Sequence, residues 1–491
     1  MKLKQQLKTP TNNQLNSHSN LIIVLSKEQT KAKWPLFPHS NTIKERLSRT
    51  GKKCTTSPFS TDLPNKIGTH TTIACIKKDI SSFELLSLCR KLAEEQLKQN
   101  PKEIALCMPG MDADLATRMT EAMIATLLAA RYEMPSYKSK KDKPLKLNSL
   151  QVYNLPEKQD FEQTFAEAEG NNLARYLTAL PPNELTPAHY RKRITSLAKD
   201  YGWKMDFLDM KTLRKKKAGA FVAVAQGSPT DDAGIVHLRY KPRSKSKLQR
   251  LALVGKGICF DTGGMNLKPA QYMHGMHEDM EGSAVALGTL IALTRLEVDF
   301  EIDCWLALAQ NHIGPKAYKQ NDVVTACNGI SIEIIHTDAE GRMVLADTLA
   351  IATKDKPDLL MDYATLTGSC VGALGTVYSG AFTNRDEYIN DIINAGRDSG
   401  ERVWPFPIDE DYDKDLESTI ADIKQCTLTS GPDHIHAARF LQRFINKTPW
   451  VHVDLSAGNN KGGLAHIATD TTAFGVRFSL DFILNKKKWR K

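Results

Sequence analysis

Two apolar segments of the chain each end abruptly in a group of charged residues. The segments are LALVGKGICFDTGGMNLKPAQYMHGMHEDM at 251–280 and IEIIHTDAEGRMVLADTLA at 332–350, and each opens with a short apolar run typical of a buried strand. In an α/β sheet, ligands bind at the edge beyond the carboxyl ends of the strands. The pattern therefore predicts an α/β fold with a functional site at one edge of its sheet.

Charged side chains in these segments are candidates for metal-dependent chemistry. They are Lys256, Asp261, Lys268, Asp279, Asp338, Glu340 and Arg342. Four carboxylates brought together repel one another, so positive charge must lie among them. Divalent cations meet this need, and Asp and Glu oxygens with one nitrogen and no Cys suit Zn, Mn, Mg or Co. Two such ions can hold a nucleophilic water and stabilise the oxyanion formed when it attacks a carbonyl, which predicts hydrolysis.

The same residues lie in blocks with a specific family resemblance. The blocks are VGKGICFDTGGMNLKP at 254–269, TDAEGR at 337–342 and DYATLTGSC at 362–370. They resemble the signature blocks of the leucyl aminopeptidase (cytosol aminopeptidase) family of dinuclear metallopeptidases, peptidase family M17. The resemblance extends over roughly residues 165–484. It implies a metal-dependent aminopeptidase that releases N-terminal residues, preferably Leu or Met, from peptides.

The resemblance also implies a set of metal ligands. Asp261 and Glu340 would bridge two divalent metal ions, Lys256 and Asp279 would complete one of them, and Asp338 would complete the other. Ligand chemistry leaves Mn²⁺ and Zn²⁺ open, with Mg²⁺ or Co²⁺ as alternatives.

Further residues receive catalytic or binding roles from the resemblance. Lys268 would polarise the scissile carbonyl, and Arg342 would hold a bicarbonate ion that serves as proton shuttle. The substrate cleft would be lined by Met276, Thr365, Leu366 and Gly368. A Met-containing apolar pocket favours Leu or Met side chains. His336 departs from the family pattern, where Asn is usual, and we expect it to make a structural hydrogen bond.

Lys256 can bind a metal ion only after it loses its proton. Taking a Lys amine from a pKa of about 10.4 to neutrality at pH 7 costs roughly 4 to 5 kcal/mol. Protons therefore compete with the metal for this amine, and we expect metal occupancy and activity to rise from about pH 7 towards about pH 9.

Apolar runs and helical patterns alternate along the second part of the chain. The expected strands lie at 251–254, 304–309, 359–366 and 450–455, and expected helices at 282–296 and 437–445. This alternation predicts a catalytic domain at 159–491 with a mixed central sheet between helices, an α/β/α sandwich. A Lys-rich stretch at 136–148 precedes a boundary near residue 158, so 21–158 forms a smaller α/β domain. The polar residues 1–20 are expected to be disordered.

The positive charge of the chain is concentrated in its first part. Residues 1–160 contain 26 Lys and Arg against 15 Asp and Glu, a balance of +11, whereas the whole chain of 491 residues carries +10. Basic segments can contact nucleic acid through phosphates. The alternative to an enzyme is therefore a DNA-binding or architectural protein built on an aminopeptidase scaffold.

Cysteine usage and hydropathy indicate the compartment. The nine cysteines include no CxxC pair, and the sequence shows neither a secretory signal nor an apolar run long enough to cross a membrane. We therefore expect a cytoplasmic protein without a membrane span. By resemblance, it would assemble as a homohexamer.

Overall fold

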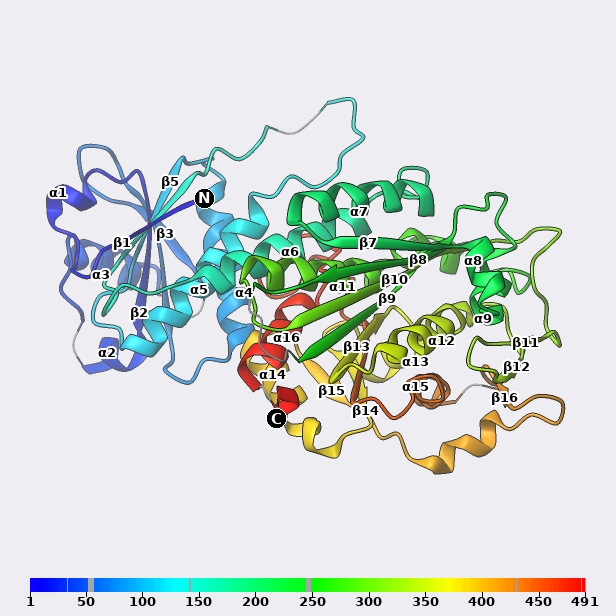
Figure 1. Cartoon of the computed structure of the whole chain (residues 1–491). Coiled ribbons are helices and arrows are strands. Elements are labelled where there is room, and N and C mark those ends of the chain that lie inside the picture. Colours follow the sequence, from blue (N-terminus) through cyan, green and yellow to red (C-terminus); the bar gives the residue numbers. More distant parts are fainter. Residues whose placement is uncertain are drawn as a thin grey trace. The chain divides into compact units, whose positions relative to one another are not determined.

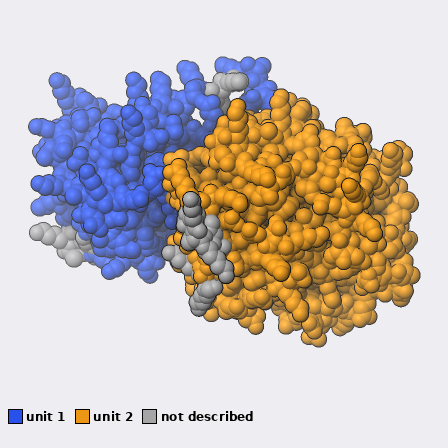
Figure 2. Space-filling model, viewed as in Figure 1, with its two compact units in different colours: residues 1–168, 462–470 blue, residues 169–461, 471–491 orange. Residues whose placement is uncertain are grey.

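The chain forms two compact units, each with its own large β-sheet (Figure 1, Figure 2). Unit 1 comprises Met1–Ala168 and Gly462–Asp470, and unit 2 comprises Glu169–Lys461 and Thr471–Lys491. The structure is a computed structural model, and it describes residues 1–32, 34–51, 57–140, 143–243, 249–429, 431–486 and 488–490. Residues 141 and 142 of the Lys-rich stretch lie outside this description. That residues 21–158 and 159–491 form separate domains, with the boundary near residue 158, stays a prediction.

A six-stranded, mainly parallel sheet organises the described part of unit 1. Its order is β1-β6-β5-β2-β4-β3, and only the edge strand β3 runs antiparallel to its neighbour. The strands are β1 (Lys2–Gln5), β2 (Asn20–Ser26), β3 (Phe59–Asp62), β4 (His70–Ile76), β5 (Glu103–Cys107) and β6 (Ser149–Tyr153). Strand β2 is buried throughout, which explains its continuous apolar sequence.

The helices of unit 1 connect these strands. They are α1 (Asn12–Leu15), α2 (Lys27–Ala32), α3 (Ser40–Arg49), α4 (Ser82–Leu97) and α5 (Ala113–Ala130). Helix α4 begins with a capping box, in which the Ser81 hydroxyl accepts from the backbone N–H of Glu84 and the Glu84 carboxylate accepts from the N–H of Ser81. Helices α4 and α5 pack against each other, and α4 also packs on β2 and β4.

The N-terminal 20 residues differ from the prediction of disorder. Lys2–Gln5 pairs in parallel with β6, and α1 begins with a capping box between Thr11 and Gln14. Side-chain polarity misled the prediction, because an edge strand needs only its backbone groups to pair and can expose polar side chains. The pairing with β6 joins segments more than a hundred residues apart, so no local pattern indicates it.

The sheet of unit 2 has eight strands among the described residues. Its order is β15-β14-β17-β13-β9-β10-β8-β7, with the four central strands β17, β13, β9 and β10 parallel. Strands β14, β8 and β7 introduce antiparallel pairings. The strands are β7 (Lys204–Asp209), β8 (Gly234–Tyr240), β9 (Arg250–Asp261), β10 (Glu301–Asn311), β13 (Leu359–Ala364), β14 (Ser379–Thr383), β15 (Val403–Pro405) and β17 (Trp450–Asp454).

A smaller sheet and the remaining helices complete the chain. The sheet consists of β11 (Val323–Thr325), β12 (Ser331–Glu333) and β16 (Ile423–Lys424). The helices are α6 (Glu162–Thr178), α7 (Pro187–Tyr201), α8 (Met210–Lys215), α9 (Gly219–Ala225), α10 (Ala270–Met273), α11 (Glu281–Arg295), α12 (Glu340–Ala352), α13 (Gly368–Leu374), α14 (Ile389–Ser399), α15 (Asp433–Gln442) and α16 (Val476–Leu480). None of the described helices is long and apolar enough to span a bilayer.

Two buried helices, α11 and α12, cover opposite faces of strand β9. Gly255 and Lys256 are neighbours in this strand, so their side-chain directions point to opposite faces. A Cβ atom at Gly255 would meet Ser283 of α11, whereas the Lys256 side chain lies against Gly341 of α12. Both helices are buried over most of their length, as expected for helices that are apolar all round. The predicted α/β/α sandwich with a mixed central sheet is therefore confirmed.

Candidate metal centre

The charged residues predicted from sequence meet at the carboxyl edge of the parallel strands in unit 2. One cavity of about 720 Å³ is lined by Lys256, Asp261, Lys268, Asp279, Asp338, Glu340 and Arg342. They come from β9, from the loop after it, from the turn before α11 and from the start of α12. Parallel strands end at the same edge of a sheet, which explains why segments far apart in sequence converge here.

Lys256 lies at the buried end of the cavity between two carboxylates. Its Nζ atom is 2.6 Å from Asp279 Oδ1 and 3.0 Å from Glu340 Oε1, and it donates to the backbone oxygen of Thr365 at 2.9 Å. Burial alone would lower the pKa of Lys256, but attraction to Asp279, Glu340 and Asp261 raises it above its ordinary value. In this arrangement of charges the amine is therefore protonated.

Lys268 joins the other two carboxylates. Its Nζ atom is 3.0 Å from Asp261 Oδ2 and 2.5 Å from Asp338 Oδ1. Burial alone would lower the pKa of Lys268, but Asp261, Glu340 and Asp338 outweigh this effect and raise it. The side chain thus keeps its positive charge at neutral pH.

The carboxylates fit a divalent cation. Ligand atoms of Asp261, Asp338 and Glu340 all lie within 4.8 Å of one another. Asp279 Oδ2 is buried and has no hydrogen-bond partner among the described residues. Burial raises the pKa of Asp279 to about 7 and, with repulsion from Glu340 and Asp279, raises that of Asp261 well above its ordinary value. Buried acids held this close require a compensating cation to stay ionised.

Backbone and amide groups fix the orientation of Asp261. Its Oδ1 atom accepts hydrogen bonds from the backbone N–H of Gly263 and from Asn311 Nδ2, both at 2.8 Å. Gly263 has φ +86°, and a Cβ there would lie 2.5 Å from the Asn266 backbone oxygen. Only glycine fits this turn without strain. Asn311 was not singled out in the sequence, although it ends the apolar run of β10.

Arg342 has a carboxylate partner of its own. Its Nη2 atom donates to Asp433 Oδ1 at 2.9 Å and Oδ2 at 2.7 Å, and its Nη1 atom donates to the backbone oxygen of Gln425 at 2.9 Å. Sequence analysis did not identify Asp433 as a partner. The only local signal is its place directly after Gly431 and Pro432, as the first residue of α15.

The residues expected to bind substrate line the same cavity. They are Met276, Thr365, Leu366 and Gly368. Thr365 Oγ1 donates to Asp279 Oδ1 at 2.8 Å, which ties the substrate side of the cavity to the carboxylate cluster. Leu366 is held by its backbone N–H, which donates to Asp454 Oδ1 at 3.0 Å.

His336 makes the kind of contact expected for a structural role. The backbone N–H of Asp338 donates to His336 Nδ1 at 3.2 Å. This bond holds the turn that leads into α12. His336 thus orients the backbone of Asp338, a candidate metal ligand.

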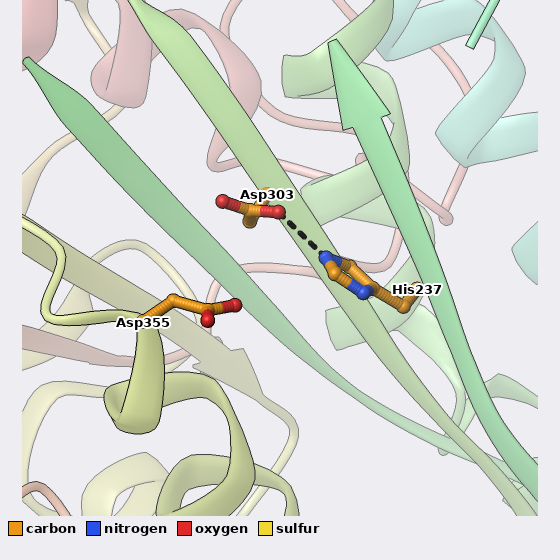
Figure 3. Close-up of side chains that lie close together, drawn as sticks. All are labelled: His237, Asp303 and Asp355. Carbon is orange, nitrogen blue, oxygen red and sulfur yellow. Dashed lines mark hydrogen bonds and ion pairs between the residues drawn. The ribbon is translucent and has the colours of Figure 1, made fainter. Parts of the chain in front are cut away.

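A second group of candidate metal ligands, at the opposite edge of the sheet, is an ion-pair network. His237 Nε2 lies 2.6 Å from Asp303 Oδ1, and Figure 3 shows the Asp355 carboxylate facing this pair. Arg250 Nε lies 3.6 Å from Asp303 Oδ2, and Arg250 Nη2 lies 2.8 Å from Glu301. Arg250 therefore supplies positive charge beside two acids of this network.

The family model described as cytosol aminopeptidase family, catalytic domain, matches residues 172–480. The chain belongs to the cytosol aminopeptidase family. A probable cytosol aminopeptidase of Wolbachia pipientis wMel is 36% identical over 439 residues, 87% of this chain and 85% of that protein. A probable cytosol aminopeptidase of Stutzerimonas stutzeri A1501 is 40% identical over 368 residues, 72% of each chain.

A solved structure of a tomato leucine aminopeptidase mutant resembles the whole chain. Its TM-score is 0.87 at 26% sequence identity, and the alignment covers 99% of this chain and 97% of the tomato chain. The two-domain fold and the family predicted from sequence are thereby confirmed. The protein is a metal-dependent aminopeptidase, a hydrolase that removes residues from the N-terminus of peptides.

Proposed function

We propose that the carboxylate cavity of this aminopeptidase holds two divalent metal ions. The proposed ligands are Lys256, Asp261, Asp279, Asp338 and Glu340. One observation carries the proposal: in a single cavity, Lys256 lies between Asp279 and Glu340 while Lys268 lies between Asp261 and Asp338. Each acid therefore lies beside a lysine amine. A bound metal ion could take over the positive charge of that amine or add to it.

The chain's own residues would orient the substrate for hydrolysis. When bound, two divalent ions would supply a water of lowered pKa and a Lewis acid for the peptide carbonyl. Lys268, which stays protonated, can donate to the carbonyl oxygen as negative charge develops there. Arg342 is paired with Asp433, and no proton transfer is assigned to the bicarbonate ion that the resemblance implies at Arg342.

The substrate preference follows from the cavity lining. Met276 and Leu366 supply apolar surface, and Thr365 and Gly368 leave room beside it. We infer a preference for N-terminal Leu or Met with broad tolerance, because methionine adapts to side chains of different shape. Carboxylate ligands and a nitrogen ligand suit Mn²⁺ or Zn²⁺, with Mg²⁺ or Co²⁺ as weaker alternatives.

The decisive experiment combines activity with metal analysis. Purified protein is assayed on leucyl-p-nitroanilide and on its N-acetylated form, before and after chelation and reconstitution. We expect about two ions per chain, loss of activity on chelation, and hydrolysis of the free-amine substrate only. Equal cleavage of both substrates, or full activity without metal, would rule out the proposed centre.

Matched variants separate the two acidic groups. Asp279→Asn should lower metal content and activity together, because it removes a buried oxygen ligand. Asp355→Asn, in the ion-pair network at the other edge of the sheet, should leave both unchanged. If Asp355→Asn lowered metal content and activity while Asp279→Asn left both unchanged, the metal site would lie in the ion-pair network instead.

The remaining expectations are part of the same proposal. We infer a homohexamer that acts in the cytoplasm on peptide substrates. The basic N-terminal segment motivated a DNA-binding alternative, but the family assignment gives that alternative no support.

A further inference from the structure

No adjacent pair of N–H groups on the Arg342 guanidinium is free to bind a second anion bidentately. Its side chain is buried, Nη2 is engaged by both oxygens of Asp433, and Nη1 is engaged by the backbone oxygen of Gln425. A carboxylate or carbonate ion binds arginine bidentately through the Nη1/Nη2 edge or the Nε/Nη2 edge. Both edges include Nη2, so either mode requires Asp433 to move away.

Asp433 is held in place from the other side as well. It is the first residue of α15, and the next residue, His434, donates its backbone N–H to Ser369 Oγ at 2.8 Å. The His434 ring closes a second contact, with Nδ1 2.9 Å from the same Ser369 oxygen. These bonds tie the start of α15 to α13, so the Asp433 carboxylate is presented to Arg342 by a fixed backbone.

The charge balance also opposes an added anion. Burial alone would raise the pKa of Asp433, but the Arg342 guanidinium, followed by His436 and His434, lowers it below its ordinary value. Asp433 is therefore ionised at neutral pH and neutralises Arg342. A second anion at this position would lie beside a like charge in a half-buried site.

We propose that Asp433 is the resident anion of Arg342, taking the position that a carbonate-like ion would need, so that turnover requires no bicarbonate. Asp433 lines the same cavity as the candidate metal ligands. It acts through Arg342 and is thus a positioning residue, which holds the guanidinium toward the reaction site. This inference rests on the proposed location of the active site.

The test compares bicarbonate dependence in the wild type and in Asp433→Ala, both fully metal-loaded. Wild-type turnover of leucyl-p-nitroanilide should be the same in bicarbonate-free and bicarbonate-containing buffer. Asp433→Ala should lose about 10-fold to 100-fold in kcat, the scale of a lost charge-assisted hydrogen bond. Added bicarbonate or formate should restore much of this loss in a saturable way, because the vacated space again admits a carboxylate beside Arg342.

A binding measurement gives a readout that does not depend on turnover. Binding of ¹³C-labelled bicarbonate, followed by NMR, should be detected for Asp433→Ala but not for the wild type or for Asp433→Ala combined with Arg342→Met. Asp433→Asn keeps the side-chain volume without the charge and should be impaired but not rescued. Asp415→Ala is the matched control, because Asp415 pairs with His436 of the same helix and is more exposed.

Each outcome decides the inference. Stoichiometric bicarbonate binding by the wild type, or its activation by bicarbonate, would overturn it, and so would an Asp433→Ala variant that is fully active or is impaired without rescue. If Asp433→Ala fails to fold, the wild-type binding measurement alone still decides. Absence of peptidase activity in the metal-loaded wild type would instead refute the proposed function and leave the anion measurement interpretable.

Discussion

Lys268 tests the proposed catalytic role at the level of one residue. Its amine lies 3.0 Å from Asp261 Oδ2 and 2.5 Å from Asp338 Oδ1 at the cavity wall. We predict that Lys268→Ala lowers kcat on leucyl-p-nitroanilide by about 100-fold to 1,000-fold, because a preorganised donor to the oxyanion is lost. Steady-state kinetics with metal content and circular dichroism measured in parallel will check this.

A surface lysine provides the control for Lys268. Lys319 also pairs with a carboxylate, Asp322, but its side chain is mostly exposed. Lys319→Ala should therefore retain wild-type kinetics. Near-native turnover in Lys268→Ala would show that the assigned role is wrong.

Lys256 links metal binding to pH. Burial lowers its pKa, but Asp279, Glu340 and Asp261 together raise it in the metal-free protein, so the amine carries a proton until metal displaces it. We predict that metal affinity increases with pH above about pH 7.5, where Asp279 has already lost its own proton, and that binding releases protons.

Calorimetry in two buffers of different ionisation enthalpy measures the released protons. Lys256→Met should bind metal more weakly, with a flatter dependence on pH in this range, because its side chain has no proton to displace. Equal affinities of the wild type from about pH 7.5 to about pH 9 would contradict the role of Lys256 as a ligand.

The close approach of α6 and α11 depends on two glycines. A Cβ at Gly288 would lie 2.5 Å from the Gly170 backbone oxygen, and one at Gly170 would lie 2.2 Å from the Gly288 oxygen. We predict that Gly288→Ala lowers the free energy of unfolding by about 1 to 3 kcal/mol, because backbone must move to admit the methyl group. Urea denaturation of the whole protein will measure the change.

A helical glycine with open space beside it is the matched control. Gly372 lies in α13 and is exposed, and no described neighbour lies within 4 Å of the position that an added methyl group would take. Gly372→Ala should be neutral or stabilise by up to about 1 kcal/mol through reduced chain entropy. If Gly288→Ala and Gly372→Ala changed the free energy of unfolding equally, close packing of α6 and α11 could not explain the effect at Gly288.

At the level of helices and strands, apolar runs predicted the central strands well. The expected runs at 251–254, 304–309, 359–366 and 450–455 all coincide with parallel strands of unit 2. Strands buried on both faces need continuous apolar sequence, which makes them visible. The edge strand β7 and the N-terminal β1 carry polar residues, and they were missed because their stability comes from backbone pairing with neighbours distant in sequence.

Metal removal should affect the stability of the whole protein. The four acids proposed as metal ligands line one cavity of unit 2. Metal bound only to the folded state stabilises it by about 2.7 kcal/mol at a free concentration 100 times the Kd. We predict that chelation lowers the melting temperature of the wild type by several degrees. Differential scanning calorimetry should find Asp279→Asn much less sensitive to chelator, and identical wild-type curves with and without metal would contradict the proposed centre.

The proposed hexamer is testable by mass. The chain has a mass of 54.7 kDa, and light scattering coupled to size-exclusion chromatography should give about six times this value. Because family resemblance supplies the expectation, a monomeric mass would overturn only the assembly and leave the family assignment intact.

The family, the α/β class and the candidate metal ligands and catalytic lysine that line the cavity could be predicted from the sequence alone. These features are encoded locally, as apolar strands that end in charged residues at fixed spacing. The partners of those residues, in contrast, depend on how the chain folds in three dimensions. Asn311 is 50 residues from Asp261, and Asp433 is 91 residues from Arg342, yet both pairs are joined by hydrogen bonds. Such contacts arise from the order of strands in the sheet, and no local pattern records which strand ends become neighbours.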